Sequence, residues 1–220
     1  MAETTTLTRT TKVEAVNRLL SVIGVAPISQ AALDGTLSLT SELAQTAIDN
    51  VSRDLQGTSW GFNTERDVEF TANGSGSIVL TSSAYSGLSI SSFDFEEPSS
   101  FDPVIKMDGV NAKIWDRETK SFTAFAASAT YKATVTYYLQ WLDLPEAVKA
   151  YVMARAAREY QLQMVGNPQM DQMLVTQMMI AQQNLTEFEA AQFDYTIFDN
   201  YDVFRSLERG PGAVVLLDRS

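Results

Sequence analysis

The sequence predicts an α+β fold in which a discontinuous helical bundle, built from two helical hairpins, carries an inserted antiparallel β-rich domain. Apolar residues recur every three or four positions near both ends of the chain, which is the period of an amphipathic helix. Between these stretches, short alternating runs are separated by turn-forming residues, as in antiparallel strands. Each hairpin has one apolar face, so we expect the two hairpins to cover one another.

The expected domains follow from this pattern. Residues 10–58 together with 144–192 form the helical bundle, residues 59–143 form the inserted β-rich domain, and residues 193–220 form an extended C-terminal arm.

The first hairpin is predicted from two helical stretches. A helix over residues 12–23 begins with a capping box made by Thr11 and Glu14 and ends at Gly24. A loop to about Gly35 leads to a second helix over residues 41–56, whose apolar face comprises Leu43, Ala47, Ile48, Val51 and Leu55.

The middle of the chain predicts short strands and turns. The serine-rich stretch 82–100 is expected to be a loop, and Gly109 closes the turn of a hairpin. Tyr131, Ala133, Val135 and Tyr137 should share one face of the last strand. The predicted strands cover residues 67–71, 78–81, 104–106, 112–115, 122–125 and 131–139.

The second hairpin is predicted at residues 145–191. A third helix over residues 145–165 places Val148, Tyr151, Val152 and Ala156 inward. Asn167 caps a fourth helix that opens at Pro168 and reaches about Ala191. This helix is rich in methionine and almost free of charge before Glu187. Such a helix is buried either at the centre of the monomer or by neighbouring subunits, and the sequence leaves both open.

The C-terminal arm is predicted to bind a partner, either a neighbouring subunit or another protein. It combines clustered aromatic residues, a glycine–proline hinge at 210–212 and a short apolar run. Aromatic side chains anchor interfaces because they bury much area at a small entropic cost. The candidate partner-binding residues are Phe193, Tyr195, Phe198, Tyr201, Phe204, Val214, Val215, Leu216 and Leu217.

The composition excludes several classes of chemistry. The chain has 220 residues without cysteine or histidine, so disulfides, thiolate or imidazole metal sites and histidine-based nucleophilic catalysis are excluded. A net charge of −11 without a basic cluster argues against specific nucleic-acid binding. The longest apolar runs have only a few residues, far below the roughly 20 that cross a bilayer, and the polar N-terminus is unlike a secretion signal. We expect no cofactor, no metal, no membrane contact and synthesis in the cytoplasm.

Three short motifs have structural interpretations that we prefer to functional ones. The NGSGS segment with Gly74 and Gly76 is followed by a strand-like run, which indicates a turn and not a phosphate loop. Glu65, Asp67 and Glu69 alternate as on the solvent face of a strand. The acidic cluster in the serine-rich region is expected to be a solvated loop, although paired carboxylates can hydrolyse glycosides; it comprises Asp94, Glu96, Glu97 and Asp102.

Four segments carry a resemblance to a known family. They are AVNRLLSVIGVAPI at 15–28, the second predicted helix at 41–56, GTSWGFNTE at 57–65 and LPEAVKAYVMARAAREYQ at 144–161. In this order they resemble the tail tubular protein A family of short-tailed bacteriophages. Residues 68–130 share with it only a general hairpin pattern, and the tail after residue 193 shares only its aromatic, acidic character.

The resemblance implies a structural protein of the virion tail and not an enzyme. It implies a dodecameric ring of this chain that lies below the portal protein, joins the tail nozzle protein and helps to dock tail fibres. DNA would pass through the ring during genome ejection without specific binding, which an acidic wall favours. The alternative is a carboxylate-based glycan hydrolase of the phage tail, since some members of the family have been proposed to cleave glycans.

Overall fold

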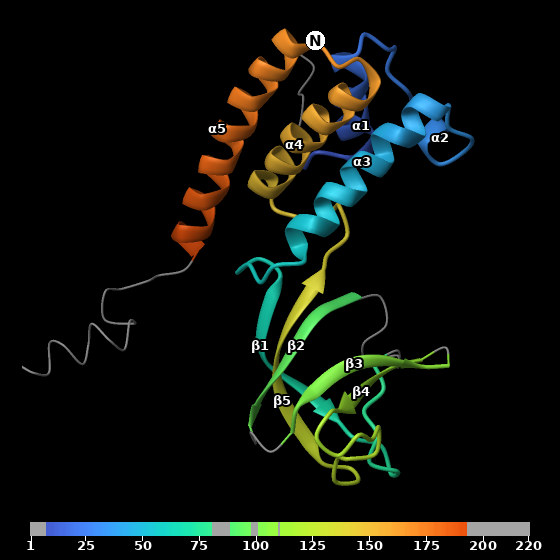
Figure 1. Cartoon of the computed structure of the whole chain (residues 1–220), viewed down its shortest axis with the longest axis vertical. Coiled ribbons are helices and arrows are strands. Elements are labelled where there is room, and N and C mark those ends of the chain that lie inside the picture. The colour runs from blue at the N-terminus through green and yellow to red at the C-terminus, as the bar shows by residue number, and fades with distance from the viewer. Residues whose placement is uncertain (1–7, 81–88, 98–100, 110, 193–220) are drawn as a thin grey trace, which may run out of the picture.

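The computed structural model describes residues 8–80, 89–97, 101–109 and 111–192, and these residues adopt an α+β fold. Within them lie five helices and two antiparallel sheets. In Figure 1 the helices gather at one end of the molecule and the strands at the other, and only two chain segments join the ends. The helices therefore come from both ends of the chain, whereas the strands come from its middle.

The helices begin and end close to the residues that the sequence predicts. The helix α1 (Lys12–Val22) has the expected capping box between Thr11 and Glu14, and α3 (Leu39–Gln56) begins two residues earlier than expected because Ser38 is its N-cap. The one-turn helix α2 (Gln30–Leu33), in a stretch expected to be a loop, is too short to show a period. The helix α4 (Glu146–Met164) and the helix α5 (Pro168–Gln192) match the second predicted hairpin, and Asn167 caps α5 as expected.

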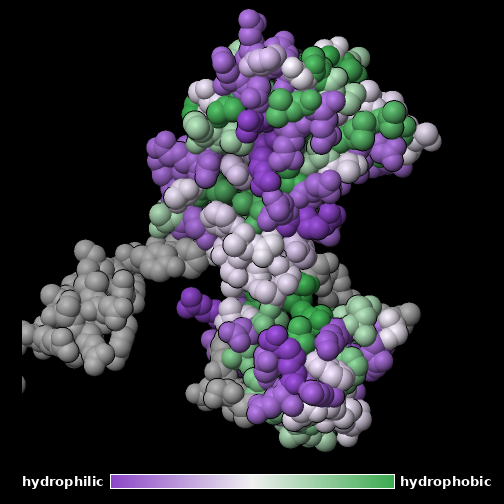
Figure 2. Space-filling model, viewed as in Figure 1, coloured by the Kyte–Doolittle hydropathy of each residue, from purple (hydrophilic) through white to green (hydrophobic). Residues whose placement is uncertain are grey.

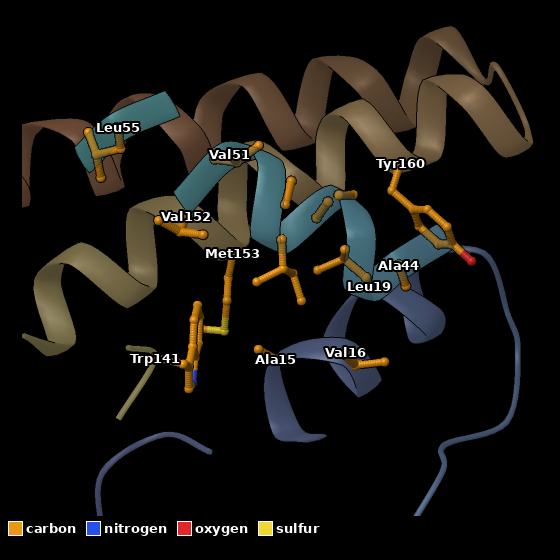
Figure 3. Packing of buried hydrophobic residues seen from close by; sticks show 14 of the residues in the cluster. Ala15, Val16, Leu19, Ala44, Val51, Leu55, Trp141, Val152, Met153 and Tyr160 are labelled. Carbon is orange, nitrogen blue, oxygen red and sulfur yellow. The ribbon is translucent and has the colours of Figure 1, made fainter. Parts of the chain in front are cut away.

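Helices α1, α3, α4 and α5 contribute to one buried hydrophobic cluster. Leu19 on α1, Val51 on α3 and Met153 on α4 belong to this cluster, and in Figure 3 the Met153 side chain points toward the ring of Trp141. Helix α4 contacts α1, α3 and α5, whereas the principal neighbour of α5 is α4 alone. The expected inward position of Leu43 is wrong, because this side chain is 37% exposed and the neighbouring Ala44 is buried in its place.

The strands form two small antiparallel sheets. The first has the order β1 (Thr64–Thr71), β5 (Thr130–Tyr138), β2 (Ser89–Glu97), and the second pairs β3 (Pro103–Asp108) with β4 (Asn111–Asp116). The expected inward face of β5 is confirmed, since Tyr131, Ala133, Val135 and Tyr137 are all buried. They join a second buried cluster that is rich in aromatic residues, such as Phe70 and Phe125.

Three expectations for the strands are wrong. Strand β2 lies in the stretch expected to be a loop, because a bulge between Ile90 and Ser92 breaks the alternation that would reveal it. Residues 122–125 form no strand, and Phe125 is instead buried against Tyr131. Of residues 78–81 the first three are described, and they form only one isolated bridge to β4; residue 81 lies outside the described part.

The NGSGS segment is a turn, as expected. The Asn73 side chain accepts hydrogen bonds from the amides of Ser75 (3.1 Å) and Ser77 (2.9 Å), and Gly76 has a φ of +74°. A Cβ atom at Gly76 would lie 2.4 Å from the carbonyl oxygen of Phe125, so only glycine fits. The glycines therefore serve the fold of the turn.

The two hydrophobic clusters agree with a helical part and a β-rich part, but the boundaries 10–58, 144–192 and 59–143 stay predictions. The expected C-terminal arm, residues 193–220, lies outside the described residues.

Candidate functional site

The partner-binding residues that the sequence predicts all lie outside the described part of the chain, so their role stays a prediction. They are Phe193, Tyr195, Phe198, Tyr201, Phe204, Val214, Val215, Leu216 and Leu217. The candidate surfaces of the described residues are those that lead to this segment or lie beside it.

The outer face of α5 is an uncharged surface that exposes large apolar side chains. Helix α5 turns Leu174, Ala181 and Leu185 towards α4 and buries them. On the other side Met173 is 62% exposed and Ile180 is 56% exposed, and these residues lie two turns apart on one line of the helix. Gln172, Met179 and Gln183 extend this face without adding charge. Exposed methionines and other large apolar side chains are typical of a surface that a partner covers.

A second exposed apolar group lies at the end of the bundle away from the strands. Leu162 and Val165 are exposed where α4 ends, and Leu39 is 71% exposed where α3 begins. The hydroxyl of Tyr160 donates a 3.0 Å hydrogen bond to the carbonyl oxygen of Thr40, which holds these two helix ends together. Figure 2 shows green apolar and purple polar groups side by side over the helical part, with a nearly neutral white surface where the two parts join.

The joint between the helices and the strands is held by two buried amide side chains. The Gln56 amide pairs with the backbone of Leu139, accepting from its N–H at 2.6 Å and donating to its carbonyl at 3.3 Å. The Asn63 amide donates to the carbonyls of Gln56 (3.0 Å) and Tyr137 (3.1 Å), and its oxygen accepts from the Trp60 amide (2.9 Å). The GTSWGFNTE segment therefore fixes how the chain passes from α3 into β1.

A groove of about 480 Å³ runs between this joint and the last two turns of α5. One wall comes from Trp60 and the start of β1, including Arg66, and the other from Glu189 and its neighbours on α5. The Gly61 amide donates a hydrogen bond to Oε1 of Glu189, whereas Oε2 of Glu189 is buried without a partner among the described residues. No pattern in the sequence predicts this groove, because its walls lie more than a hundred residues apart.

The carboxylates that could serve a hydrolase occupy ordinary structural positions. Asp94 lies exposed on β2, so its expected place in a loop is wrong, and Asp102 pairs with Arg117 at 2.6 Å. The side chains of Glu96 and Glu97 are outside the described part. Glu65, Asp67 and Glu69 are exposed on β1, as expected. No group of metal-binding type occurs in the parts of the chain that the structure describes.

The carboxylate of Asp116 is buried, and its hydrogen bonds serve the fold of the β-rich part. Asp116 is fully buried, and burial alone would raise its pKa. Hydrogen bonds from the hydroxyl and amide of Thr119 and from the amides of Asp102 and Glu118 outweigh burial and lower the pKa below the ordinary value. Asp116 therefore stays ionised and ties the loop after β4 to the start of β3.

The described surfaces define a protein whose candidate sites are contact surfaces: an uncharged helix face, an apolar bundle end and a groove. No helix in the described ranges is both long and apolar enough to cross a membrane.

The Tail tubular protein family model matches residues 13–195, and the chain belongs to this family. The match includes the β-rich middle, in which only a general resemblance could be recognised from the sequence. A search of curated proteins finds no match. The family is a structural component of the bacteriophage tail, so the chain is a structural protein of the virion tail that assembles with other tail components.

Proposed function

We propose that the chain is a tail adaptor, which forms a dodecameric ring between the portal protein and the tail nozzle protein. The observation that carries this proposal is the outer face of α5, where Met173, Met179 and Ile180 are exposed on a helix without charge between Asp171 and Glu187. The described residues of a single subunit leave this face in water, whereas a neighbour in a ring would cover it.

Ring formation requires two different surfaces on each subunit, because a heterologous contact closes into a ring. The α5 face offers one of these two lateral surfaces, and the exposed bundle end near Leu39 and Val165 offers a separate surface for the portal or the nozzle. The net charge of −11 suits a wall that DNA passes without binding. Tail fibres would dock on the β-rich part, which points away from this bundle end (Figure 1).

The test is a mixture of the purified protein with portal protein, measured by light scattering and negative-stain imaging. We expect a ring-sized complex, because the ring assembles either alone or on the portal. A chain that stays monomeric and unbound in this mixture would refute the proposal.

A pair of charge variants tests whether the α5 face is the interface between neighbouring subunits. A double variant with Met173→Glu and Ile180→Glu should lose the complex, because two charges would have to be buried in the interface. Its control carries Ala127→Glu and Gln140→Glu, which add the same charge at exposed positions away from α5, and should assemble normally. If the two variants assemble equally well, the α5 face is not the interface.

We further propose that the arm, residues 193–220, contacts a neighbouring subunit or the portal. Truncation after Leu207 removes the hinge and the apolar run 213–217. The truncated chain should keep its melting temperature but bind portal poorly. Unfolding of the truncated monomer would make the tail part of the core, and normal binding would make it dispensable.

The proposed adaptor has no enzymatic activity. The family is a structural one, and of the acidic cluster considered for a hydrolase, Asp94 is exposed and Asp102 is paired with Arg117. Reproducible cleavage of a capsule polysaccharide, lost on substitution of one aspartate or glutamate, would overturn this part of the proposal.

A further inference from the structure

The groove between α5 and β1 combines an apolar wall with one cation and one anion. Trp60 supplies much of the apolar surface, and its indole N–H is already used, donating to the Leu55 carbonyl at 2.9 Å. Its ring stacks on Phe62, with ring centroids 6.2 Å apart. The wall is therefore rigid and presents a fixed aromatic surface to an occupant.

The two charged groups of the groove have unused binding capacity. Arg66 is exposed and forms no hydrogen bond or ion pair with the described part of the chain, although the chain as a whole is acidic. Glu189 uses Oε1 on the Gly61 amide and has Oε2 buried without a partner among the described residues. A buried carboxylate oxygen without a donor is costly, so an occupant should supply one donor for Glu189 and one carboxylate for Arg66.

The chain itself continues from the edge of this groove. Ala190 lines the groove, and α5 ends at Gln192. The next three residues are Phe193, Asp194 and Tyr195, an aromatic ring, a carboxylate and a phenol. Three residues span at most about 11 Å, and Glu189 and Ala190 of the groove wall lie within three residues of the end of α5.

We infer that residues 193–195 dock in the groove of their own chain, which leaves residues 196–220 as the part of the arm that contacts a neighbouring subunit or the portal. The Phe193 ring packs against Trp60, the Asp194 carboxylate pairs with Arg66, and the Tyr195 hydroxyl donates to Oε2 of Glu189. The covalent link to α5 favours the chain's own segment over that of another copy, because a short connection gives a high effective concentration. The family match also ends at residue 195, so it includes this segment and excludes the rest of the arm.

Docking at this point would fix the direction in which the arm leaves the body. Residues 196–220 would then start from one place beside the joint of helices and strands, close to the outer face of α5. Only this consequence rests on the proposed function; the docking itself involves one chain and is tested without portal or nozzle.

The absence of cysteine allows a direct test by site-specific cross-linking of the full chain. One variant carries Ser59→Cys on the groove wall and Thr196→Cys just after the docked segment. The control carries Asn184→Cys and the same Thr196→Cys; Asn184 is exposed near the end of α5 but does not line the groove. With a short bis-maleimide we expect an intramolecular cross-link that forms several-fold more in the groove pair than in the control pair.

A charge exchange tests the chemistry of the same contact. Arg66→Glu in the groove pair should lower the cross-linking yield several-fold, and adding Asp194→Arg should restore it. Thermal melting of each variant reports its fold, and Thr64→Cys replaces Ser59→Cys if the first variant does not fold.

Two results would overturn the inference. Equal yields in the groove pair and the control pair would show a segment without a preferred site. Cross-linked dimers between separate Ser59→Cys and Thr196→Cys chains, without the intramolecular product, would assign the groove to a second copy. Neither result would affect portal binding, so the two proposals fail independently.

Discussion

Helices α4 and α5 form one hairpin, yet α4 is enclosed by other helices and α5 has one face exposed. Helix α4 carries five charged residues, and it is the helix enclosed by α1, α3 and α5. Helix α5 has no charge between Asp171 and Glu187, and it is the helix with a broad exposed face. Judged by hydrophobicity alone, the uncharged α5 would be the enclosed helix and the charged α4 would be the exposed one. The burial of a helix here depends on whether its polar groups find partners.

The charges of α4 are accommodated one by one. The Lys149 side chain is fully buried, with its ammonium 3.0 Å from Glu146 and 6.0 Å from the centre of the Trp141 ring. Arg155 pairs with Asp54 on α3 at 2.5 Å and with Glu159 at 3.0 Å. The exposed methionines of α5 have no such partners among the described residues, and we propose that a neighbouring subunit covers them.

The strongest test of this comparison uses the same substitution on both helices. Met153→Ala on α4 should lower the free energy of unfolding by about 2–5 kcal/mol, because it empties a filled core position. Met173→Ala on α5 should change it by less than about 0.5 kcal/mol, because the side chain is already in water. Urea unfolding of the unassembled chain measures both. Equal losses would show that α5 is covered within the monomer.

The helices were predictable because their signals are local. The capping box of Thr11 and Glu14 and the Asn167–Pro168 start of α5 each lie within a few residues, and the structure has both. The same holds for the inward face of β5, where Tyr131, Ala133, Val135 and Tyr137 alternate in the sequence with polar residues and are all buried, although Thr136 is buried as well.

The remaining features depend on contacts between distant residues. A bulge between Ile90 and Ser92 places Ile90 and Phe93 three positions apart and hides β2 from a period-two pattern. Gln56 and Leu139, like Gly61 and Glu189, meet only in the folded chain, so the joint and the groove had no sequence signal. Periodicity likewise identifies an apolar face but not which helix has three neighbours.

The buried lysine of α4 gives the second test. Glu146→Ala should cost about 2–3 kcal/mol, because it leaves the ammonium of Lys149 buried without its counter-charge, while the half-exposed position of Glu146 limits the loss. Lys149→Met should stay within about 1 kcal/mol of the original stability, since it keeps the volume and removes the charge. A larger loss for Lys149→Met than for Glu146→Ala would contradict this account of how α4 tolerates its charges.

Low pH should weaken the hydrogen bonds that Glu146, at the start of α4, accepts from Thr10 and Lys149. Burial would raise the pKa of Glu146, but hydrogen bonds from Thr10 and Lys149 outweigh it and hold the pKa below the ordinary 4.5. A lowered pKa in the folded state means that the stabilisation is complete above the unfolded value and is lost as the pH falls through the folded value. Glu146→Gln should therefore flatten the fall in melting temperature below about pH 4.5. Glu187→Gln on the exposed part of α5 serves as the control and should leave the fall unchanged.

The smallest change in stability is expected from the ion pair between Arg158 on α4 and Asp171 on α5. Arg158 donates to both carboxylate oxygens of Asp171, at 2.7 and 3.4 Å, beside the start of α5. Both side chains are partly exposed, so Arg158→Ala should cost less than about 1 kcal/mol of global stability. Its effect should be local: the amides of α5 should exchange with solvent several-fold faster, because only Leu174, Ala181 and Leu185 then hold this helix by burial. Arg155→Ala is the matched control, since Arg155 ties α4 to α3 and not to α5. If both variants leave hydrogen exchange of α5 unchanged, the three buried side chains suffice and the ion pair contributes nothing to the position of the helix.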